Sequence, residues 1–234
     1  ECTGPTETFT IIVNPTAQVN EVANQVLCNT ESTDEIIFSS NNTDGTTTYS
    51  WTNNNTASGL EASGDGNIPS FVGTAGTSPE VSNITVTPLY SNNGEECQGP
   101  SFTFSITVNP TAQVDEVVNQ VLCNNESTDA INFSTENSGG TTTYAWTNNN
   151  TNIGLGASGD GNIPSFTAVA GTTSETATIV VTPTFTNNDV QCTGPTDTFT
   201  ITVNPTAQVN EVASQVLCNT ESTNAINFST ENLD

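Results

Sequence analysis

Residues 46–55 read TTTYSWTNNN, and an almost identical stretch, TTTYAWTNNN, occupies residues 141–150. In the first copy Thr47, Tyr49 and Trp51 stand at alternate positions, which is the period of a β-strand with two different faces. β-Branched and aromatic residues favour strands, and the asparagines that follow favour a turn. The stretch therefore predicts a strand that buries Trp51, and its copy Trp146, in a core.

The rest of the chain repeats at the same interval of 95 residues. A gap-free comparison of residues 15–109 with residues 110–204 gives 63 identities in 95 positions. This period is too long for one turn of a solenoid and suits an autonomous β-sandwich, which commonly has about 100 residues. We therefore expect the C-terminal strand of a preceding repeat at 1–14, immunoglobulin-like repeats at 15–109 and 110–204, and the N-terminal part of a following repeat at 205–234.

Each repeat carries about seven segments with strand character, separated by turn clusters such as SSNNTDG and SGDGN. Phe9, Ile11 and Val13 alternate with other residues in Thr8–Val13, and the alternation returns in both later copies. The fold class expected from these patterns is all-β, with tandem immunoglobulin-like sandwiches that form a rod or filament. Further strands are expected over Val22–Leu27, Ile36–Phe38, Thr46–Thr52, Ile68–Val72 and Val81–Tyr90.

The charge is entirely negative, with 25 Asp and Glu residues, no Lys, no Arg and no His. Without basic residues the chain cannot neutralise a phosphate backbone or bind an anionic membrane surface, so nucleic acids are excluded as partners. The commonest general base, histidine, is also missing, and no pair of carboxylates stands out as catalytic. We therefore expect no enzyme activity, and the lack of a long apolar run predicts no membrane insertion.

Six cysteines recur at the repeat interval, and repeat symmetry leaves two pairing schemes. One closes each repeat, joining Cys28 to Cys97 and Cys123 to Cys192. The other straddles each boundary between repeats. Each of its two cysteines lies about one strand of seven residues, or ~23 Å, from that boundary, whereas a disulfide needs its Cα atoms close together. The first scheme has its own difficulty, because the strands that carry its two cysteines run parallel in the usual sandwich. We favour the first scheme as the structural disulfides, with straddling (Cys2–Cys28, Cys97–Cys123, Cys192–Cys218) and interchain pairing as alternatives; either implies an oxidising, extracellular compartment.

Calcium is the ligand that best suits a surface with only acidic charges, because it binds carboxylate and amide oxygens. No other cofactor is expected. The SGDGN loops resemble the opening of a calcium loop but lack its distal glutamate, and acids also gather near the repeat boundaries. An ordinary glycine turn and solvated acids are the simpler reading of both places. The weak calcium candidates are Asp65, Asn67, Asp160, Asn162, Glu21, Asp115 and Glu116.

The phrases NQVLCNTEST (24–33), SGDGNIPSF (63–71), ITVTP (84–88) and CTGPTDTFTITVNP (192–205) resemble the tandem PKD-like, immunoglobulin-like repeats of giant surface adhesins of Bacteroidota, of the Flavobacteriia type. The resemblance covers the whole chain. It implies secretion by the type IX route, display on the cell surface, and a role in adhesion, gliding or biofilm. The complete lack of basic residues departs from ordinary members of that family.

The leading functional prediction is an extracellular structural and adhesive repeat protein that forms a stalk, fibre or filament. Its expected partners are adjacent repeats or subunits of itself, including strand addition by Thr8–Val13, and a host, surface or glycan ligand. The alternative is a glycan- or protein-binding module that uses Trp51, Tyr49 or the NNNT loops. Near-identical copies favour spacing over a set of different ligand specificities.

Overall fold

A computed structural model describes residues 2–232 and shows an all-β protein with β-sandwich architecture. Its contacts divide the chain into two compact units. Unit 1 comprises Glu1–Thr111, Ser138–Gly140 and Thr186–Cys192. Unit 2 comprises Ala112–Asn137, Thr141–Phe185 and Thr193–Asp234. No helix within residues 2–232 has the length and hydrophobicity of a membrane span.

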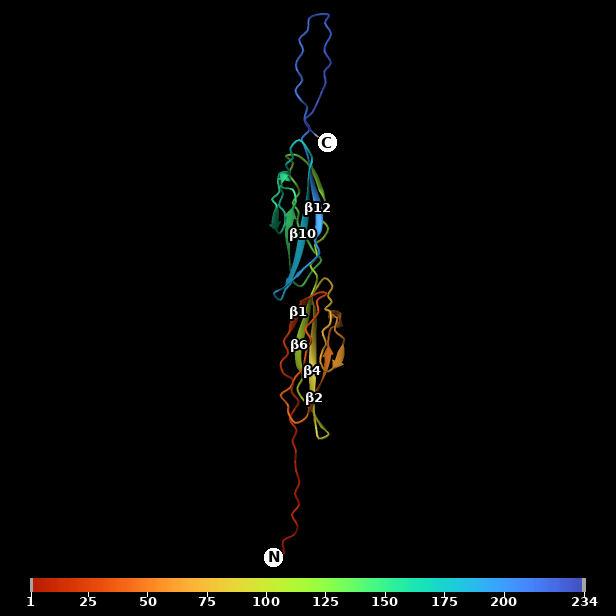
Figure 1. The fold of residues 1–234 in the computed structure, drawn as a ribbon, viewed down its shortest axis with the longest axis vertical. Helices are drawn as coiled ribbons and strands as arrows, with labels where there is room; N and C mark the ends of the chain where they lie inside the picture. Colours follow the sequence, from red (N-terminus) through yellow and green to blue (C-terminus); the bar gives the residue numbers. More distant parts are fainter. Residues whose placement is uncertain (1, 233–234) are drawn as a thin grey trace. The chain divides into compact units, whose positions relative to one another are not determined.

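The first sheet runs in the order β1-β6-β4-β2-β3, with β5 paired to β4 beside this path (Figure 1). The pairing of β1 with β6 is parallel, and the other pairings are antiparallel. A short 3-10 turn, η1 (Thr56–Ser58), follows β2. The strands are β1 (Gln25–Cys28), β2 (Thr46–Asn53), β3 (Ser63–Asp65), β4 (Glu80–Asn92), β5 (Glu95–Gln98) and β6 (Phe102–Asn109).

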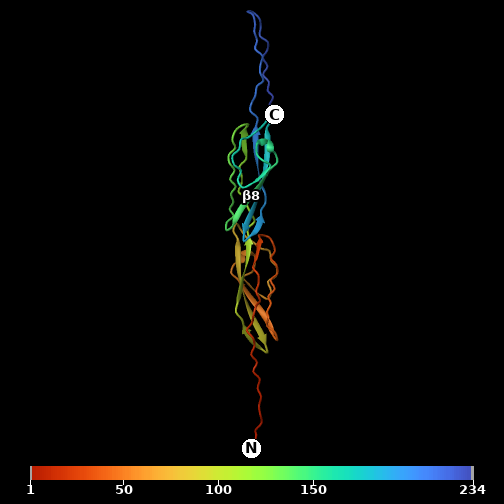
Figure 2. The ribbon, with the colours of Figure 1, turned by 90° about the vertical axis from the view of Figure 1, so that its left-hand side faces the viewer.

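The second sheet repeats this order as β7-β12-β10-β8-β9, with β11 paired to β10. Its turn η2 (Thr151–Ile153) stands where η1 stands in the first copy. Figure 2, turned by 90° about the vertical axis from Figure 1, labels β8 of this sheet. The strands are β7 (Gln120–Cys123), β8 (Thr141–Asn148), β9 (Ser158–Asp160), β10 (Glu175–Asn187), β11 (Val190–Thr193) and β12 (Asp197–Asn204).

The layer that faces each sheet is made of extended segments with few ladder bonds. Ile36 and Ile68 form an isolated bridge, with N–H to O distances of 2.9 and 3.0 Å in the two directions. Strands were expected over Ile36–Phe38 and Ile68–Val72, and the structure has single bridges there instead. Both isoleucines are nevertheless buried, because they close the core from the side opposite the sheet.

Trp51 and Trp146 lie in these cores, with 6% and 7% of their surfaces exposed. Each indole ring lies over a glycine of the SGDGN loop. A Cβ atom added to Gly64 would lie 2.4 Å from Cζ2 of Trp51, and Gly159 stands in the same relation to Trp146. The glycine is therefore needed because a side chain would occupy the space of the tryptophan ring.

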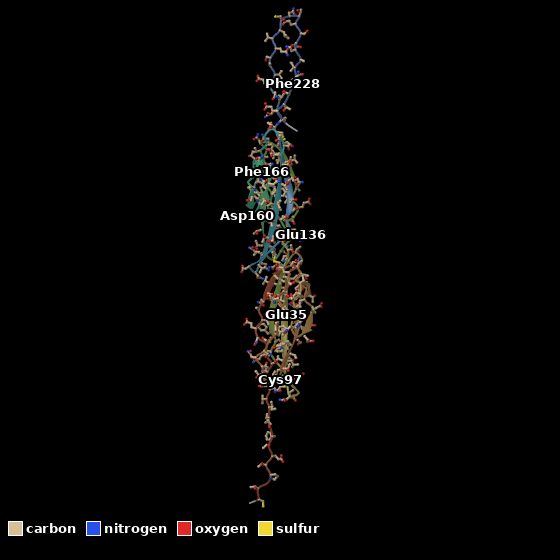
Figure 3. The ribbon with its side chains drawn as sticks, in the orientation of Figure 1. Glu35, Cys97, Glu136, Asp160, Phe166 and Phe228 are labelled. Carbon is tan, nitrogen blue, oxygen red and sulfur yellow. A yellow bond between two sulfur atoms is a disulfide. The ribbon has the colours of Figure 1, made fainter. Side chains whose placement is uncertain are left out.

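The segments near the two ends of the chain differ from the equivalent segments of the 95-residue repeats, which lie in the two sheets and their cores. Thr8–Val13 was expected to be a strand, but it has no ladder partner, and 86% of the surface of Phe9 is exposed. Its counterparts in β6 and β12 each pair with two strands, which explains the difference. Phe228, labelled in Figure 3, is 76% exposed, whereas its counterpart Phe38 is 6% exposed.

Candidate functional site

A disulfide joins Cys28, at the end of β1, to Cys192 in β11, with 5.5 Å between the Cα atoms. Both residues belong to unit 1. In the sequence, however, they lie 164 residues apart and in successive 95-residue repeats. Four further cysteines within the described residues are free: Cys2, Cys97, Cys123 and Cys218.

The expected pairing of Cys28 with Cys97 and of Cys123 with Cys192 is therefore wrong, and so is the straddling scheme. The reason is the direction of β1. Parallel pairing sets Leu27, the neighbour of Cys28, level with Val108 in β6, and Val108 is level with Glu80 in β4. Cys97 is level with Tyr90 in β4, ten residues further along that strand. At about 3.3 Å per residue, the two cysteines of the expected pair are separated by roughly 33 Å.

The figures agree with this register. The label of β1 in Figure 1 and that of Cys97 in Figure 3, which share one orientation, stand toward opposite ends of unit 1. A disulfide needs Cα atoms within about 7 Å, so the sheet itself forbids the bond within the repeat.

Two asparagines next to the disulfide, Asn109 and Asn187, donate hydrogen bonds to each other. The amide nitrogen of Asn109 donates to the backbone oxygen of Asn187 at 3.1 Å, and the amide nitrogen of Asn187 donates to Oδ1 of Asn109 at 2.9 Å. Asn14 and Asn92 form the same reciprocal pair, at 3.1 and 3.0 Å. The sequence reasoning missed these residues, although their identity in successive copies was the available signal.

Cys28 itself is held by its neighbours. Its backbone N–H donates to Oε2 of Glu31 at 2.8 Å, and the next residue, Asn29, donates from its backbone to the carbonyl of Asn109 at 2.7 Å. The side chain of Asn29 donates to Oγ1 of Thr111 at 3.1 Å and accepts from the N–H of Ala75 at 3.0 Å. The strand end that carries Cys28 is therefore held by hydrogen bonds in addition to the disulfide.

The SGDGN loops do not gather cation ligands. Asn67 uses its amide oxygen to accept the backbone N–H of Phe38 at 3.0 Å, and Asn162 does the same for Phe133. Asp65 and Asp160 are exposed at the ends of β3 and β9. Within residues 2–232 no group of three or more Asp, Glu, Cys or His side chains could hold a metal ion.

The acids near the repeat boundaries, Glu21, Asp115 and Glu116, are exposed. Asp115 accepts a hydrogen bond from the hydroxyl of Ser134 at 2.6 Å and, together with Glu116, lines an open surface cavity. Burial raises the pKa of Tyr144, and the negative charge of Asp115 raises it further. Burial also raises the pKa of Tyr49.

The NNNT loops are occupied by their own hydrogen bonds. Asn53 donates to the carbonyls of Asn55 and Leu60, and Asn55 accepts the N–H of Ala57 and donates to Oε2 of Glu80 at 2.8 Å. In the second copy Asn148 donates to the carbonyls of Leu155 and Gly156, and Asn150 accepts the N–H of Asn152 and donates to Oε2 of Glu175 at 2.8 Å. The asparagines therefore shape the loop, as asparagine side chains commonly do in turns.

No family model matches the chain, and the comparison with curated proteins found no match. Ninety chains of solved structures match it. Fibronectin(III)-like modules of Clostridium thermocellum CbhA match at 16% identity and a TM-score of 0.31, over 81% of this chain and 94% of that chain. Human mucin-like protocadherin EC1-2 matches at 9% identity and a TM-score of 0.36, over 81% and 98%. The human desmocollin-1 ectodomain matches at 11% identity and a TM-score of 0.29, over 89% and 44%.

Proposed function

We propose that this chain is an extracellular structural and adhesive protein, in which tandem immunoglobulin-like repeats form a stalk or filament. The observation that carries the proposal is the Cys28–Cys192 disulfide, because it ties one sequence repeat to the next. A bond of this kind resists extension of the chain between the two cysteines, which is the task of a load-bearing stalk.

The compartment follows from the same bond, since disulfides form and persist in oxidising surroundings outside the cytosol. The formal charge of −25 adds to the proposal, because like charges keep long acidic molecules apart unless cations screen them. Resemblance of the repeat motifs to Bacteroidota surface adhesins is the reason to place the stalk on a bacterial cell surface, with type IX secretion as its route. The adhesive contact is then made with a host surface or a glycan.

The test is electron microscopy of the protein isolated from its native source, before and after treatment with a reductant. The proposal expects fibres longer than three domains of this size can span, and it expects reduction to make them more flexible. Short particles of uniform length that reduction leaves unchanged would contradict the stalk.

A further inference from the structure

We propose that Cys97 and Cys123 each form a disulfide of the same kind as Cys28–Cys192, and that each bonds to a cysteine in a further copy of the 95-residue repeat. Each of the two positions is called a half-site, because it supplies one cysteine of such a bond. Strand-end cysteines (Cys28, Cys123, Cys218) would then each bond to the hairpin cysteine 164 residues further along one continuous polypeptide. The structure contains one example of this bond, between Cys28 and Cys192.

The sequence repeat makes the two classes of cysteine equivalent. Cys28, Cys123 and Cys218 follow the same residues, QVL, and Cys2, Cys97 and Cys192 precede the same GP pair by one residue. A bond between Cys97 and Cys123 would correspond to a bond between Cys2 and Cys28. In the structure, however, Cys28 bonds to Cys192 and Cys2 is free.

The half-site at Cys123 is built like the one at Cys28. Its N–H donates to Oε2 of Glu126 at 2.7 Å, as that of Cys28 donates to Glu31 at 2.8 Å. Cys123 is level with Asn204 in a parallel pairing, as Cys28 is level with Asn109.

Asn124 reproduces the role of Asn29. Its side chain donates to Oγ1 of Thr206 at 3.3 Å and accepts the N–H of Ala170 at 3.0 Å. The strand end that presents the thiol is therefore formed without the disulfide, and the Cys123 side chain is exposed.

The half-site at Cys97 is also preformed. Cys97 lies in a β4–β5 hairpin like the β10–β11 hairpin of Cys192, and the Asn14–Asn92 pair stands beside it as the Asn109–Asn187 pair stands beside Cys192. Gly99 donates its N–H to the carbonyl of Pro88 at 3.0 Å, as Gly194 does to Pro183 at 3.1 Å. The segment that precedes a repeat thus lies against the hairpin in the same way in both copies.

The chemistry of each new bond is an oxidation of two thiols. Each thiol loses one proton and one electron, and the two sulfur atoms join. The two protons and two electrons reduce the disulfide of a thiol–disulfide oxidant to a dithiol, so an oxidant of that class is the co-reactant.

The proposed pattern would limit how far an array of repeats can be stretched. A covalent path that enters at Cys28 crosses the disulfide to Cys192 and then follows only 26 residues of backbone to Cys218, where the next bond begins. At about 3.5 Å per residue, this path is roughly 90 Å long for every two repeats. The same two repeats without disulfides would extend to roughly 660 Å.

The test is peptide mapping of the protein isolated from its native source, alkylated and digested without reduction. Trypsin has no site in this chain, but cleavage after glutamate places the six cysteines on six different peptides. The proposal expects peptide 97–116 to be linked to a peptide that contains the QVLC motif of the preceding repeat. It expects peptide 117–126 to be linked to a hairpin peptide of the following repeat. Alkylated Cys97 and Cys123, or a direct link between peptides 97–116 and 117–126, would overturn it.

A second experiment uses the full chain with one additional copy of residues 110–204 inserted after Asn204. Oxidation should link Cys123 to the hairpin cysteine of the added copy, and Cys123→Ser should leave that cysteine free to alkylation. Electrophoresis with and without reductant shows whether the partner cysteine belongs to the same chain or to another one, because only a bond between different chains adds the mass of a whole chain. Bonds between different chains in both experiments would overturn the proposal that the disulfides form within one continuous polypeptide. The stalk proposal is tested separately by microscopy, so the two can fail independently.

Discussion

Breaking the Cys28–Cys192 disulfide should change the length to which a single chain can be stretched. The bond hides 164 residues from a force applied at the two termini. At about 3.5 Å per residue, the oxidised chain should extend to roughly 250 Å, and reduction should release a further ~570 Å. The pair of substitutions Cys28→Ser and Cys192→Ser should give the longer value without reductant.

The assay is single-molecule force spectroscopy with handles attached at both termini through peptide tags. The matched control is the variant with Cys97→Ser and Cys123→Ser, which removes two free thiols and should leave the oxidised length unchanged. The extra length released on reduction distinguishes the pairing schemes. Bonds from Cys28 to Cys97 and from Cys123 to Cys192 would close two loops of 69 residues each, and reduction would release only about 480 Å. A release of that size, or no difference on reduction, would refute the reasoning.

Three further changes test other parts of the structure. Replacing Gly64 by alanine should destabilise the protein by about 1–3 kcal/mol in urea denaturation, because the new Cβ would meet the Trp51 ring, whereas Gly76→Ala, in open space, should be nearly neutral. The stability that protonated Tyr144 contributes should be fully present below about pH 10 and lost above it, because burial and Asp115 raise its folded-state pKa and the unfolded chain loses that proton first. Urea midpoints should therefore fall less steeply above about pH 10 in Tyr144→Phe, and an unchanged pH profile in that variant would contradict this. Calcium should raise the melting temperature no more than magnesium at equal concentration, because the amide oxygens of Asn67 and Asn162 already accept backbone N–H groups and Asp65 and Asp160 are exposed, and a calcium-specific rise would contradict that expectation.

The sequence alone predicted the all-β class and a strand around Trp51, because the period-two alternation and the glycine and asparagine turns are local features. The sequence also determines local hydrogen bonds that were not predicted from it. Cys218 donates its N–H to Glu221 at 2.8 Å, as Cys28 does to Glu31, although the segment after Asn204 has no sheet of its own within the described residues. Such bonds join residues a few positions apart, so the chain forms them without a core.

Only the tertiary structure decided which cysteines meet and which side chains are buried. Phe228 and Phe38 occupy equivalent places in the repeat, yet only Phe38 is buried, because β2, β4 and β6 cover it. The disulfide depends in the same way on long-range pairing. Separation in sequence places Cys28 closer to Cys97 than to Cys192, but the parallel alignment of β1 with β6 carries Cys28 to the far end of the sheet. Direction within a sheet is set by contacts between strands that are distant in the sequence, and no local pattern of residues encodes it.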